Sequence, residues 1–173
     1  MKVQLIDNGD GTQSVIEEWQ VFNTTADTHP IHLHQVSFQI VSRQQFAWTV
    51  TDSTTGEFKV TGLIGQPRGP DANEAGWKDT VQMNPGEVTI IRAKFDLPGK
   101  YVWHCHILEH EEHDMMNEYE VVSAPKKSTA QPATQSSVVA NALALAPSGS
   151  TDPTIAIDPL AAEVVSLTKK KQQ

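Results

Sequence analysis

Short runs in which apolar and polar residues alternate dominate the first 122 residues of the chain. In Gln35–Ser42, for example, Val36, Phe38 and Ile40 occupy every second position. Successive side chains of a β-strand point to opposite faces, so this spacing predicts strands with one buried face. Strands are predicted in the same way at Val3–Ile6, Ser14–Asn23, Phe46–Val50, Phe58–Thr61, Asp79–Met83, Glu87–Phe95, Tyr101–His104 and Glu118–Val122.

Turn-forming residues separate the predicted strands. The glycine-rich run Asp7–Thr12 predicts a hairpin between the first two, and Pro-Gly pairs follow Asn84 and Leu97. Many short strands without a long helical period predict an all-β fold, a Greek-key sandwich or barrel. Gly62–Gly76 is predicted to be a long loop, and loops of this length inside compact domains are often functional.

The composition changes after residue 122. All eleven aromatic residues precede residue 120, whereas Ser123–Gln173 is rich in Ala, Ser, Thr and Pro. Such a segment buries too little apolar surface to offset the entropy of ordering it. We therefore expect one folded domain, residues 1–122, and a low-complexity, mostly disordered tail, residues 123–173, in which Ile155–Leu167 is predicted to form an amphipathic helix. Because the chain begins close to its first histidine motif, the presence of the domain's opening strands stays an open question.

The charge distribution narrows the choice of partners. Residues 1–122 carry 8 Lys+Arg against 18 Asp+Glu, a net charge of −10, and the tail carries 5 against 3, a net charge of +2. An acidic folded domain repels phosphate backbones, which argues against nucleic acid. No apolar run approaches the roughly 20 residues of a membrane span. The N-terminus also lacks the pattern of an export signal.

All seven histidines fall in two short clusters, and the only cysteine lies in the second cluster, so it forms no internal disulfide. Imidazoles beside a single thiolate, with a methionine ten residues further on, form the mixed nitrogen and soft-sulfur set that selects copper over harder metals. The residues concerned are His29, His32 and His34 in the first cluster, and His104, Cys105, His106, His110, His113 and Met115 in the second.

Strand alternation predicts that the tripeptide His104–His106 serves two metal sites. On an extended backbone His104 and His106 project to one face and Cys105 to the other. His32 and His34 likewise share a face, and they supply a second pair of imidazoles to the site that His104 and His106 form.

The thiolate of Cys105 predicts a second kind of site on the opposite face. His29, which precedes Pro30, is expected on a loop from which it reaches the thiolate. With His110 and a weak axial Met115, this completes the His₂Cys plus Met set of a blue-copper electron-transfer site.

Other metal sites match the pattern less well. A structural zinc site is closed by four protein ligands, so it would not require six histidines and one thiol. His110-Glu-Glu-His113 has i,i+3 spacing, whereas the metalloprotease motif needs i,i+4. His113 is therefore expected to be an ordinary exposed or hydrogen-bonded histidine, and Trp103 a core residue.

Three motifs resemble the C-terminal cupredoxin domain of the multicopper oxidases, in particular the branch of bacterial laccases, spore-coat laccases and bilirubin oxidases. The resemblance covers residues 1 to about 122 and implies a cupredoxin-like (plastocyanin-like) fold. The motifs are His-Pro-Ile-His-Leu-His-Gln-Val-Ser-Phe-Gln-Ile from His29, Gly-Trp-Lys-Asp-Thr from Gly76, and Tyr-Val-Trp-His-Cys-His-Ile-Leu-Glu-His-Glu-Glu-His-Asp-Met-Met from Tyr101.

The resemblance also implies a role for each ligand. Type-1 copper would be held by His29, Cys105, His110 and Met115, type-2 copper by His32, and the type-3 pair by His34, His104 and His106. Oxidases of this kind oxidise phenols, aromatic amines, pigments or metal ions one electron at a time and reduce dioxygen to water. Glu111 and Asp114, next to the ligands, are candidate proton donors.

The chain departs from the family in lacking the four histidines that an N-terminal domain contributes to the trinuclear cluster. The resemblance therefore implies a fragment of a larger oxidase that needs a missing N-terminal domain, outside the cytoplasm or on a spore surface. Three alternatives stay open: a stand-alone cupredoxin that carries electrons or binds copper, a fragment with relic ligands, and a homo-oligomer in which two copies pool eight histidines.

Overall fold

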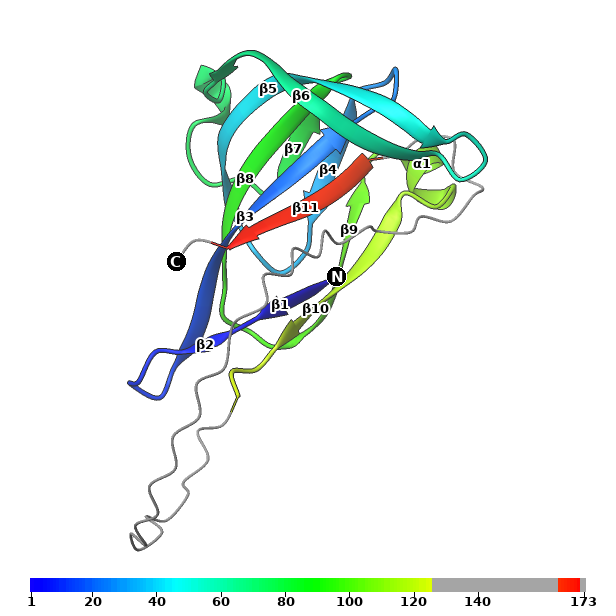
Figure 1. Cartoon of the computed structure of the whole chain (residues 1–173). Helices are drawn as coiled ribbons and strands as arrows, with labels where there is room; N and C mark the ends of the chain where they lie inside the picture. Colours follow the sequence, from blue (N-terminus) through cyan, green and yellow to red (C-terminus); the bar gives the residue numbers. More distant parts are fainter. Residues whose placement is uncertain (126–164, 172–173) are drawn as a thin grey trace, which may run out of the picture. The chain divides into compact units, whose positions relative to one another are not determined.

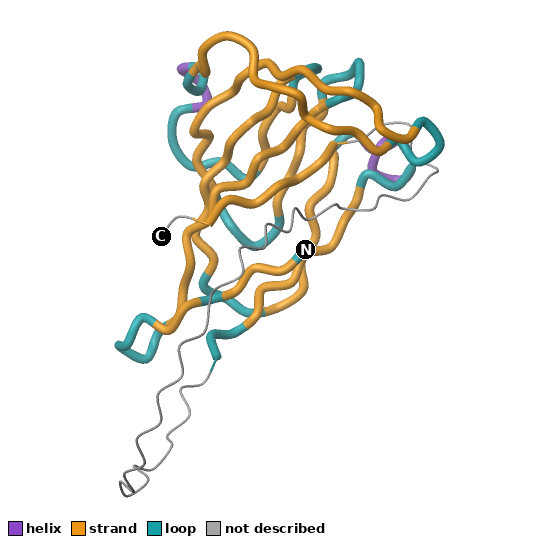
Figure 2. The backbone as a smooth tube through the Cα atoms, viewed as in Figure 1, coloured by secondary structure: helices purple, strands orange, loops and turns teal. Residues whose placement is uncertain are grey.

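The computed structural model describes residues 1–125 and the backbone of residues 165–171 (Figures 1 and 2). A short 3₁₀ helix, η1 (Ala72–Glu74), and a short α-helix, α1 (Leu108–Glu112), accompany the strands. The strands are β1 (Lys2–Gln4), β2 (Ile6–Asp7), β3 (Gln13–Asn23), β4 (His29–Leu33), β5 (Phe38–Asp52), β6 (Glu57–Arg68), β7 (Thr80–Met83), β8 (Glu87–Phe95), β9 (Gly99–Cys105), β10 (Met116–Val122) and β11 (Val165–Lys171).

The strands form two sheets. One has the order β1-β10-β9-β4-β7 and the other β11-β3-β8-β5-β6, with β2 paired to β3 (Figure 1). The main apolar core takes side chains from both sheets, among them Trp19 on β3, Phe38 on β5, Met83 on β7 and Tyr119 on β10. An all-β sandwich is therefore confirmed.

Alternation along the strands builds this core. In β8, Ile91, Ala93 and Phe95 are buried while Arg92 and Lys94 are exposed. Large rings from different strands then meet inside. Trp19 stacks on Phe95 with ring centroids 5.4 Å apart, and Tyr119 meets Trp19 edge-on at 5.3 Å. Such aromatic pairs add stabilisation beyond the area that they bury.

Tyr119 also ties the core to the first histidine cluster. Its hydroxyl donates a hydrogen bond to the backbone carbonyl of His34, and burial raises the pKa of Tyr119 above its ordinary value. We expect Tyr119→Phe to lower the free energy of unfolding by about 1 kcal/mol, because the ring stays while the carbonyl of His34 loses its hydrogen-bond donor. Urea denaturation measures this. Tyr101→Phe, whose hydroxyl makes only long bonds of 3.2 and 3.4 Å to Leu97 and Pro98 carbonyls, is the matched control. Equal losses in both variants would contradict the prediction.

Two predicted strands merge and one predicted loop is largely a strand. Residues 38–42 of the strand predicted at Gln35–Ser42 and the whole stretch 46–50 belong to the single strand β5, which carries a register shift between Ile40 and Ser42 against β8, whereas residues 35–37 precede the strand. β6 reaches Arg68, so the first half of the loop predicted at Gly62–Gly76 pairs with β5. This part has no apolar alternation, and pairing with β5 satisfies its backbone groups instead.

The N-terminal hairpin is confirmed in part. Ile6 pairs with Ser14 and Asp7 with Gln13 across the predicted turn. Val3, predicted in the same strand as Ile6, belongs to β1 and pairs in parallel with Val121 of β10, in the other sheet. The chain changes sheet at Leu5, which is buried in the core and bonds its N–H to the carbonyl of Val122.

The C-terminal segment contains a strand that the sequence did not predict. β11 runs antiparallel to β3, with Val165 opposite Asn23 and Lys171 opposite Glu17. The helix predicted at Ile155–Leu167 is therefore wrong over its last three residues, and these seven residues do not follow the prediction of a disordered tail. The strand covers an edge of β3 whose backbone groups would otherwise face solvent. The rest of that tail, 126–164 and 172–173, lies outside the described residues.

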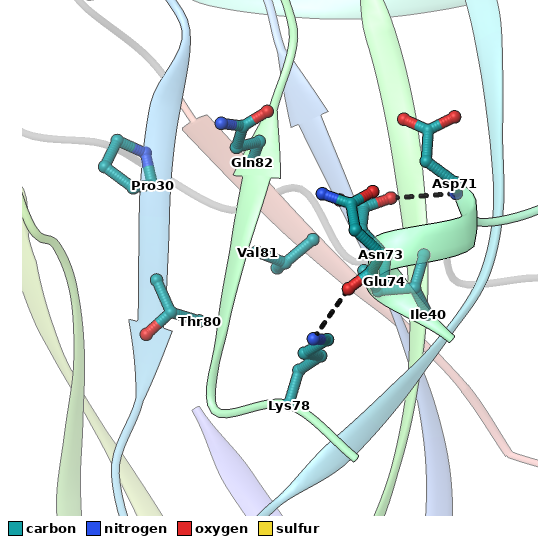
Figure 3. A pocket seen from close by; sticks show the side chains of 9 residues that line it. All are labelled: Pro30, Ile40, Asp71, Asn73, Glu74, Lys78, Thr80, Val81 and Gln82. Carbon is teal, nitrogen blue, oxygen red and sulfur yellow. Dashed lines mark hydrogen bonds between the residues drawn. The ribbon is translucent and has the colours of Figure 1, made fainter. Parts of the chain in front are cut away.

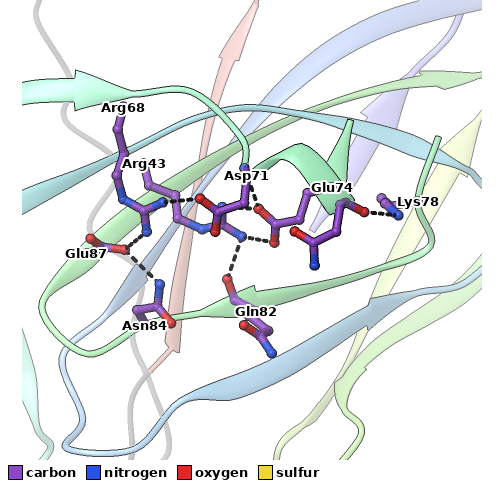
Figure 4. Close-up of polar contacts among 9 residues, drawn as sticks. Arg43, Arg68, Asp71, Glu74, Lys78, Gln82, Asn84 and Glu87 are labelled. Atoms are coloured by element: carbon purple, nitrogen blue, oxygen red, sulfur yellow. Dashed lines mark hydrogen bonds and ion pairs between the residues drawn. The ribbon is translucent and has the colours of Figure 1, made fainter. Parts of the chain in front are cut away.

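A buried ion pair fixes η1 against the sheets (Figure 4). Arg43 on β5, 1% exposed, donates two hydrogen bonds of 2.6 Å to the carboxylate of Glu74 and a third, of 3.2 Å, to the carbonyl of Gln82. The hydrogen bond from Arg43 is the main reason that the pKa of Glu74 lies below its ordinary value. Arg68 bonds to Glu87 at 3.0 Å beside this pair. The segment that leads into β7 is thereby held in place.

No helix in the described part of the chain has the length and apolar character that crossing a membrane takes.

Candidate metal centre

The register between β4 and β9 places His29 beside Cys105. Ile31 lies opposite Cys105, and residues two apart along a strand share a face, so His29 lies on the thiol's face. His29 is the first residue of β4, whereas the sequence placed it on a loop. His32 and His34 lie three and five residues after His29, so on an extended backbone their side chains point to the opposite face from that of His29.

His110 and Met115 reach the same place through the segment that follows β9. α1 carries His110, and the N–H of Met115 bonds to the carbonyl of His110. The N–H of Cys105 then bonds to the carbonyl of Met115 at 3.0 Å. The chain thus folds back on Cys105, and the side chain of Met115 is buried in the core beside it.

The three donor atoms form a compact triangle. Cys105 Sγ lies 3.7 Å from Nδ1 of His29 and 3.7 Å from Nδ1 of His110, and the two nitrogens are 3.1 Å apart. His29 and Cys105 are fully buried. The circle through three atoms with these separations has a radius of about 2.0 Å, close to the roughly 2.0–2.3 Å bonds that nitrogen and sulfur donors make to a first-row metal such as zinc.

This donor set fits copper. Two imidazoles and one thiolate in a trigonal arrangement, with a methionine available as a weak axial ligand, are the pattern of blue-copper sites. A structural zinc site would need a fourth closed ligand. Water is excluded from the thiol, because Cys105 is fully buried in a core that also contains Ile31, Leu33 and Trp103.

A second group of histidines lies on the opposite face of the same strands. His32 of β4 pairs directly with His104 of β9, so their side chains are neighbours. Ligand atoms of His32, His34 and His104 all lie within 4.8 Å of one another, and Nε2 of His34 is 3.2 Å from Nε2 of His104. His106, exposed just past the end of β9, adds a ring centred 5.3 Å from His104 and 5.5 Å from His32.

Hydrogen bonds orient two of these imidazoles. Thr80 donates its hydroxyl hydrogen to Asp79 at 3.1 Å and lies 3.1 Å from Nδ1 of His32, so Nδ1 of His32 carries the hydrogen and Nε2 is free to bind a metal. Nδ1 of His104 lies 3.0 Å from the carbonyl of Cys105, which only accepts. Nε2 of His104 is therefore also available as a ligand.

The surroundings of His34 favour the uncharged form of its imidazole. Partial desolvation, followed by the neighbouring His32 and His104, lowers the pKa of His34, and the carboxylate of Glu111 opposes that shift. A lowered pKa leaves the imidazole neutral at neutral pH, which is the form that binds metals.

Of the two predicted proton donors, the structure brings only Glu111 to the histidines. Oε2 of Glu111 lies 3.4 Å from Nδ1 of His104. Asp114 is exposed after the end of α1 and adopts a left-handed backbone conformation with φ 72°. His113 is exposed as predicted, and its Nδ1 contacts the carbonyl of Glu109.

Sequence reasoning missed the polar residues that orient the ligands. Thr80 and Asp79 lie in the quoted Gly-Trp-Lys-Asp-Thr motif, which was the only signal for them. Thr25 lies 2.7 Å from Nε2 of His29 and 2.8 Å from Oδ1 of Asn23. Thr25 lies outside every predicted strand and quoted motif, and Asn23 stood out only as the last residue of the strand predicted at Ser14–Asn23.

A cavity of about 310 Å³ lies at the edge strand β7 (Figure 3). It contains no histidine or cysteine, and Glu74 in its wall already pairs with Arg43. Its lining consists of Pro30, Ile40, Asp71, Asn73, Glu74, Lys78, Thr80, Val81 and Gln82. The metal centre is therefore a set of side chains between strands, not this cavity.

Comparison with known proteins points to a copper protein, as the geometry of the donor atoms does. Residues 10–125 match the family model described as multicopper oxidase. The chain is 45% identical over 108 residues to a laccase of Bacillus stratosphericus, covering 62% of this chain and 20% of the relative. It is 45% identical over 111 residues to the laccase of Bacillus subtilis (strain 168), covering 64% and 21%.

Among solved structures, a multi-copper oxidase from Pediococcus acidilactici is 29% identical and aligns with a TM-score of 0.48, over 79% of this chain and 22% of that one. The chain thus spans about a fifth of the length of the curated laccases that it matches. On the family match over residues 10–125 and the two donor sets, this chain belongs to the multicopper oxidase family, and it is a copper-binding domain of that family.

Proposed function

We propose that this chain is the domain of a laccase-like oxidase that receives electrons from a reducing substrate and supplies half of the site at which dioxygen is reduced to water. His29, Cys105, His110 and Met115 hold the type-1 copper. His32 serves type-2 copper, and the type-3 pair takes His34, His104 and His106. When bound, copper supplies one-electron chemistry at the first site and binding and reduction of dioxygen at the second.

The back-to-back arrangement of Cys105 and its neighbours is the observation that carries this proposal. Cys105 directs its sulfur toward His29 and His110, while the adjacent His104 contacts His34. One peptide bond therefore joins a ligand of the first set to a ligand of the second. This short covalent path gives electrons a route between the two sites.

Glu111 is the residue that we assign as the proton donor for dioxygen reduction. Making two water molecules from one dioxygen takes four electrons and four protons, so an acid near the histidine group is needed. The carboxylate of Glu111 contacts His104, and Asp114 has no comparable position. Glu111 is therefore the better supported proton donor.

The remaining ligands of the cluster would come from the N-terminal domain of the oxidase, which the chain's one-fifth share of its relatives leaves room for. The reducing substrate would be a phenol, an aromatic amine, a pigment or a metal ion. A stand-alone cupredoxin that only carries electrons is the second candidate. It has no use for His32, His34 and His104 on the far side of the thiolate site, so their clustering favours the oxidase.

Copper titration of the full chain, followed by visible absorption and electron paramagnetic resonance, tests the proposal. We expect one intensely blue centre and a further, non-blue copper at the histidine group. His34→Gln is expected to weaken the non-blue copper and to leave the blue band unchanged, because His34 belongs to the donor group that does not include the thiolate. A single blue copper with no second site would favour the electron carrier, and no blue centre would favour a relic. Sedimentation as a copper-loaded monomer would remove the alternative of two copies that pool their histidines.

A further inference from the structure

We propose that Asn23 and Thr25 are positioning residues of the thiolate site, because together they hold His29 in the neutral tautomer whose Nδ1 carries no hydrogen. The inference rests on the proposed role of His29 as a ligand. It follows from counting donors and acceptors along one chain of hydrogen bonds that begins at the end of β3.

The side-chain amide of Asn23 has a fixed orientation. Asn23 is fully buried, and its Nδ2 donates to the carbonyls of Asp27 at 2.7 Å and Met83 at 2.8 Å. Both partners only accept, so exchanging the amide nitrogen and oxygen would break two buried hydrogen bonds. Oδ1 of Asn23 therefore faces Thr25.

The hydroxyl of Thr25 has a single hydrogen, and two oxygens that can only accept lie beside it, Oδ1 of Asn23 at 2.8 Å and the carbonyl of Asp27 at 3.2 Å. Asn23 makes the shorter contact, and with either acceptor the hydrogen is directed away from His29. Oδ1 of Asn23 accepts from the N–H of Thr25 at 2.9 Å and from its hydroxyl at 2.8 Å. A carbonyl-type oxygen has no hydrogen of its own, so the hydrogen in the second contact belongs to Thr25. The backbone N–H of Asp27 donates to the same hydroxyl oxygen at 3.2 Å. One lone pair on that oxygen is left for His29.

His29 must donate to this lone pair. Its Nε2 lies 2.7 Å from Oγ1 of Thr25, and because the hydroxyl hydrogen is already committed, the hydrogen in this contact sits on Nε2. A neutral imidazole carries only one N–H. The other nitrogen, Nδ1, therefore presents a lone pair, and Nδ1 is the atom that faces Cys105 and His110.

These hydrogen bonds thus hold His29 in its metal-binding form in the metal-free protein. The ligand atom is already deprotonated, the ring is fixed by a hydrogen bond on its far side, and both Asn23 and His29 are shielded from water. Outer hydrogen-bond partners of this kind orient the ligand and raise its basicity, and removing one typically lowers metal affinity about 10–100-fold.

The first test needs no copper. In the full copper-free chain labelled with ¹⁵N, two-dimensional NMR of the imidazoles is expected to show a pyrrole-like Nε2 and a pyridine-like Nδ1 for His29. The opposite pattern would overturn the inference, and this measurement does not depend on any variant's ability to fold.

The second test compares Thr25→Val, Thr25→Ser and Thr61→Val. Valine keeps the shape of threonine but removes the acceptor, so we expect copper at the blue centre to bind about 10–100-fold more weakly and the tautomer preference of His29 to be lost. Serine keeps the hydroxyl and should restore both properties. Thr61, exposed on β6, is the matched control and should bind like the parent chain.

The outcomes separate this inference from the proposed function. A parent chain that forms no blue centre, yet shows the expected tautomer of His29, would contradict the proposed function alone. A blue centre whose affinity is the same in Thr25→Val as in the parent would overturn the positioning role. Equal weakening by Thr25→Ser and Thr25→Val would also overturn it.

Discussion

Replacing Cys105 with serine is expected to abolish the intense blue absorption of the copper-loaded chain and to lower copper affinity at that site more than about 100-fold, beyond the 10–100-fold typical of losing an outer partner. The thiolate is the only sulfur anion in the chain, and the charge-transfer colour of blue copper depends on it. A serine hydroxyl is a harder and far weaker donor. Its hydrogen-bonding groups would face His29 and His110, so the fold is expected to persist, which a thermal melt checks.

The matched control for this variant is His113→Gln. His113 lies eight residues after Cys105, and its imidazole contacts the carbonyl of Glu109. It belongs to neither donor group. The blue band should therefore survive in His113→Gln. A blue band in Cys105→Ser, or its loss in His113→Gln, would contradict the assignment of the thiolate site.

Glu74→Gln is expected to lower the free energy of unfolding by about 3–5 kcal/mol, since it leaves the buried guanidinium of Arg43 without its counter-charge. The side chain of Arg43 is 1% exposed and that of Glu74 14% exposed, so solvent screens the guanidinium poorly once the carboxylate is lost. Guanidinium chloride denaturation at pH 7 measures the loss. Because η1 leads into β7 and Thr80, the same variant should also weaken the ordering of His32.

The pH dependence of this pair has a definite sign. Hydrogen bonding to Arg43 lowers the pKa of Glu74 from 4.5, so the unfolded chain takes up its proton at a higher pH than the folded chain does. The stabilisation is therefore complete above about pH 4.5 and is lost as the pH falls through the folded pKa. Glu74→Gln should flatten the stability curve over that acidic range.

Glu120→Gln is the control for the ion-pair prediction. Glu120 pairs with Lys2 at 3.3 Å, but the two side chains are 36% and 74% exposed. Exposed pairs contribute about 0–1 kcal/mol, so this variant should be close to the parent. A similar loss in both variants would mean that the general charge balance, not the burial of Arg43, accounts for the effect.

The alternation of apolar residues predicted the strands of the sandwich where each strand has one buried face. It worked for β8, whose alternating residues pack into the core. It worked less well for β6 and the second half of β5, where most side chains are exposed on both faces. There the backbone pairing of neighbouring strands decides the structure, and pairing leaves no periodic mark in a single sequence. β11 is likewise defined by its backbone pairing with β3.

The sequence by itself determined which metal-binding side chains the protein has and that they point to opposite faces of an extended strand. A single cysteine between two histidines, on an extended backbone, must send its sulfur and the imidazoles in opposite directions. The tertiary structure alone decided which partners meet. The register of β4 against β9 brings His29 to Cys105 and His32 to His104, and the fold of α1 returns His110 and Met115 to the thiol. The contact between His29 and His110, which are 81 positions apart, arises from packing and pairing of whole strands, so it cannot be read from local spacing.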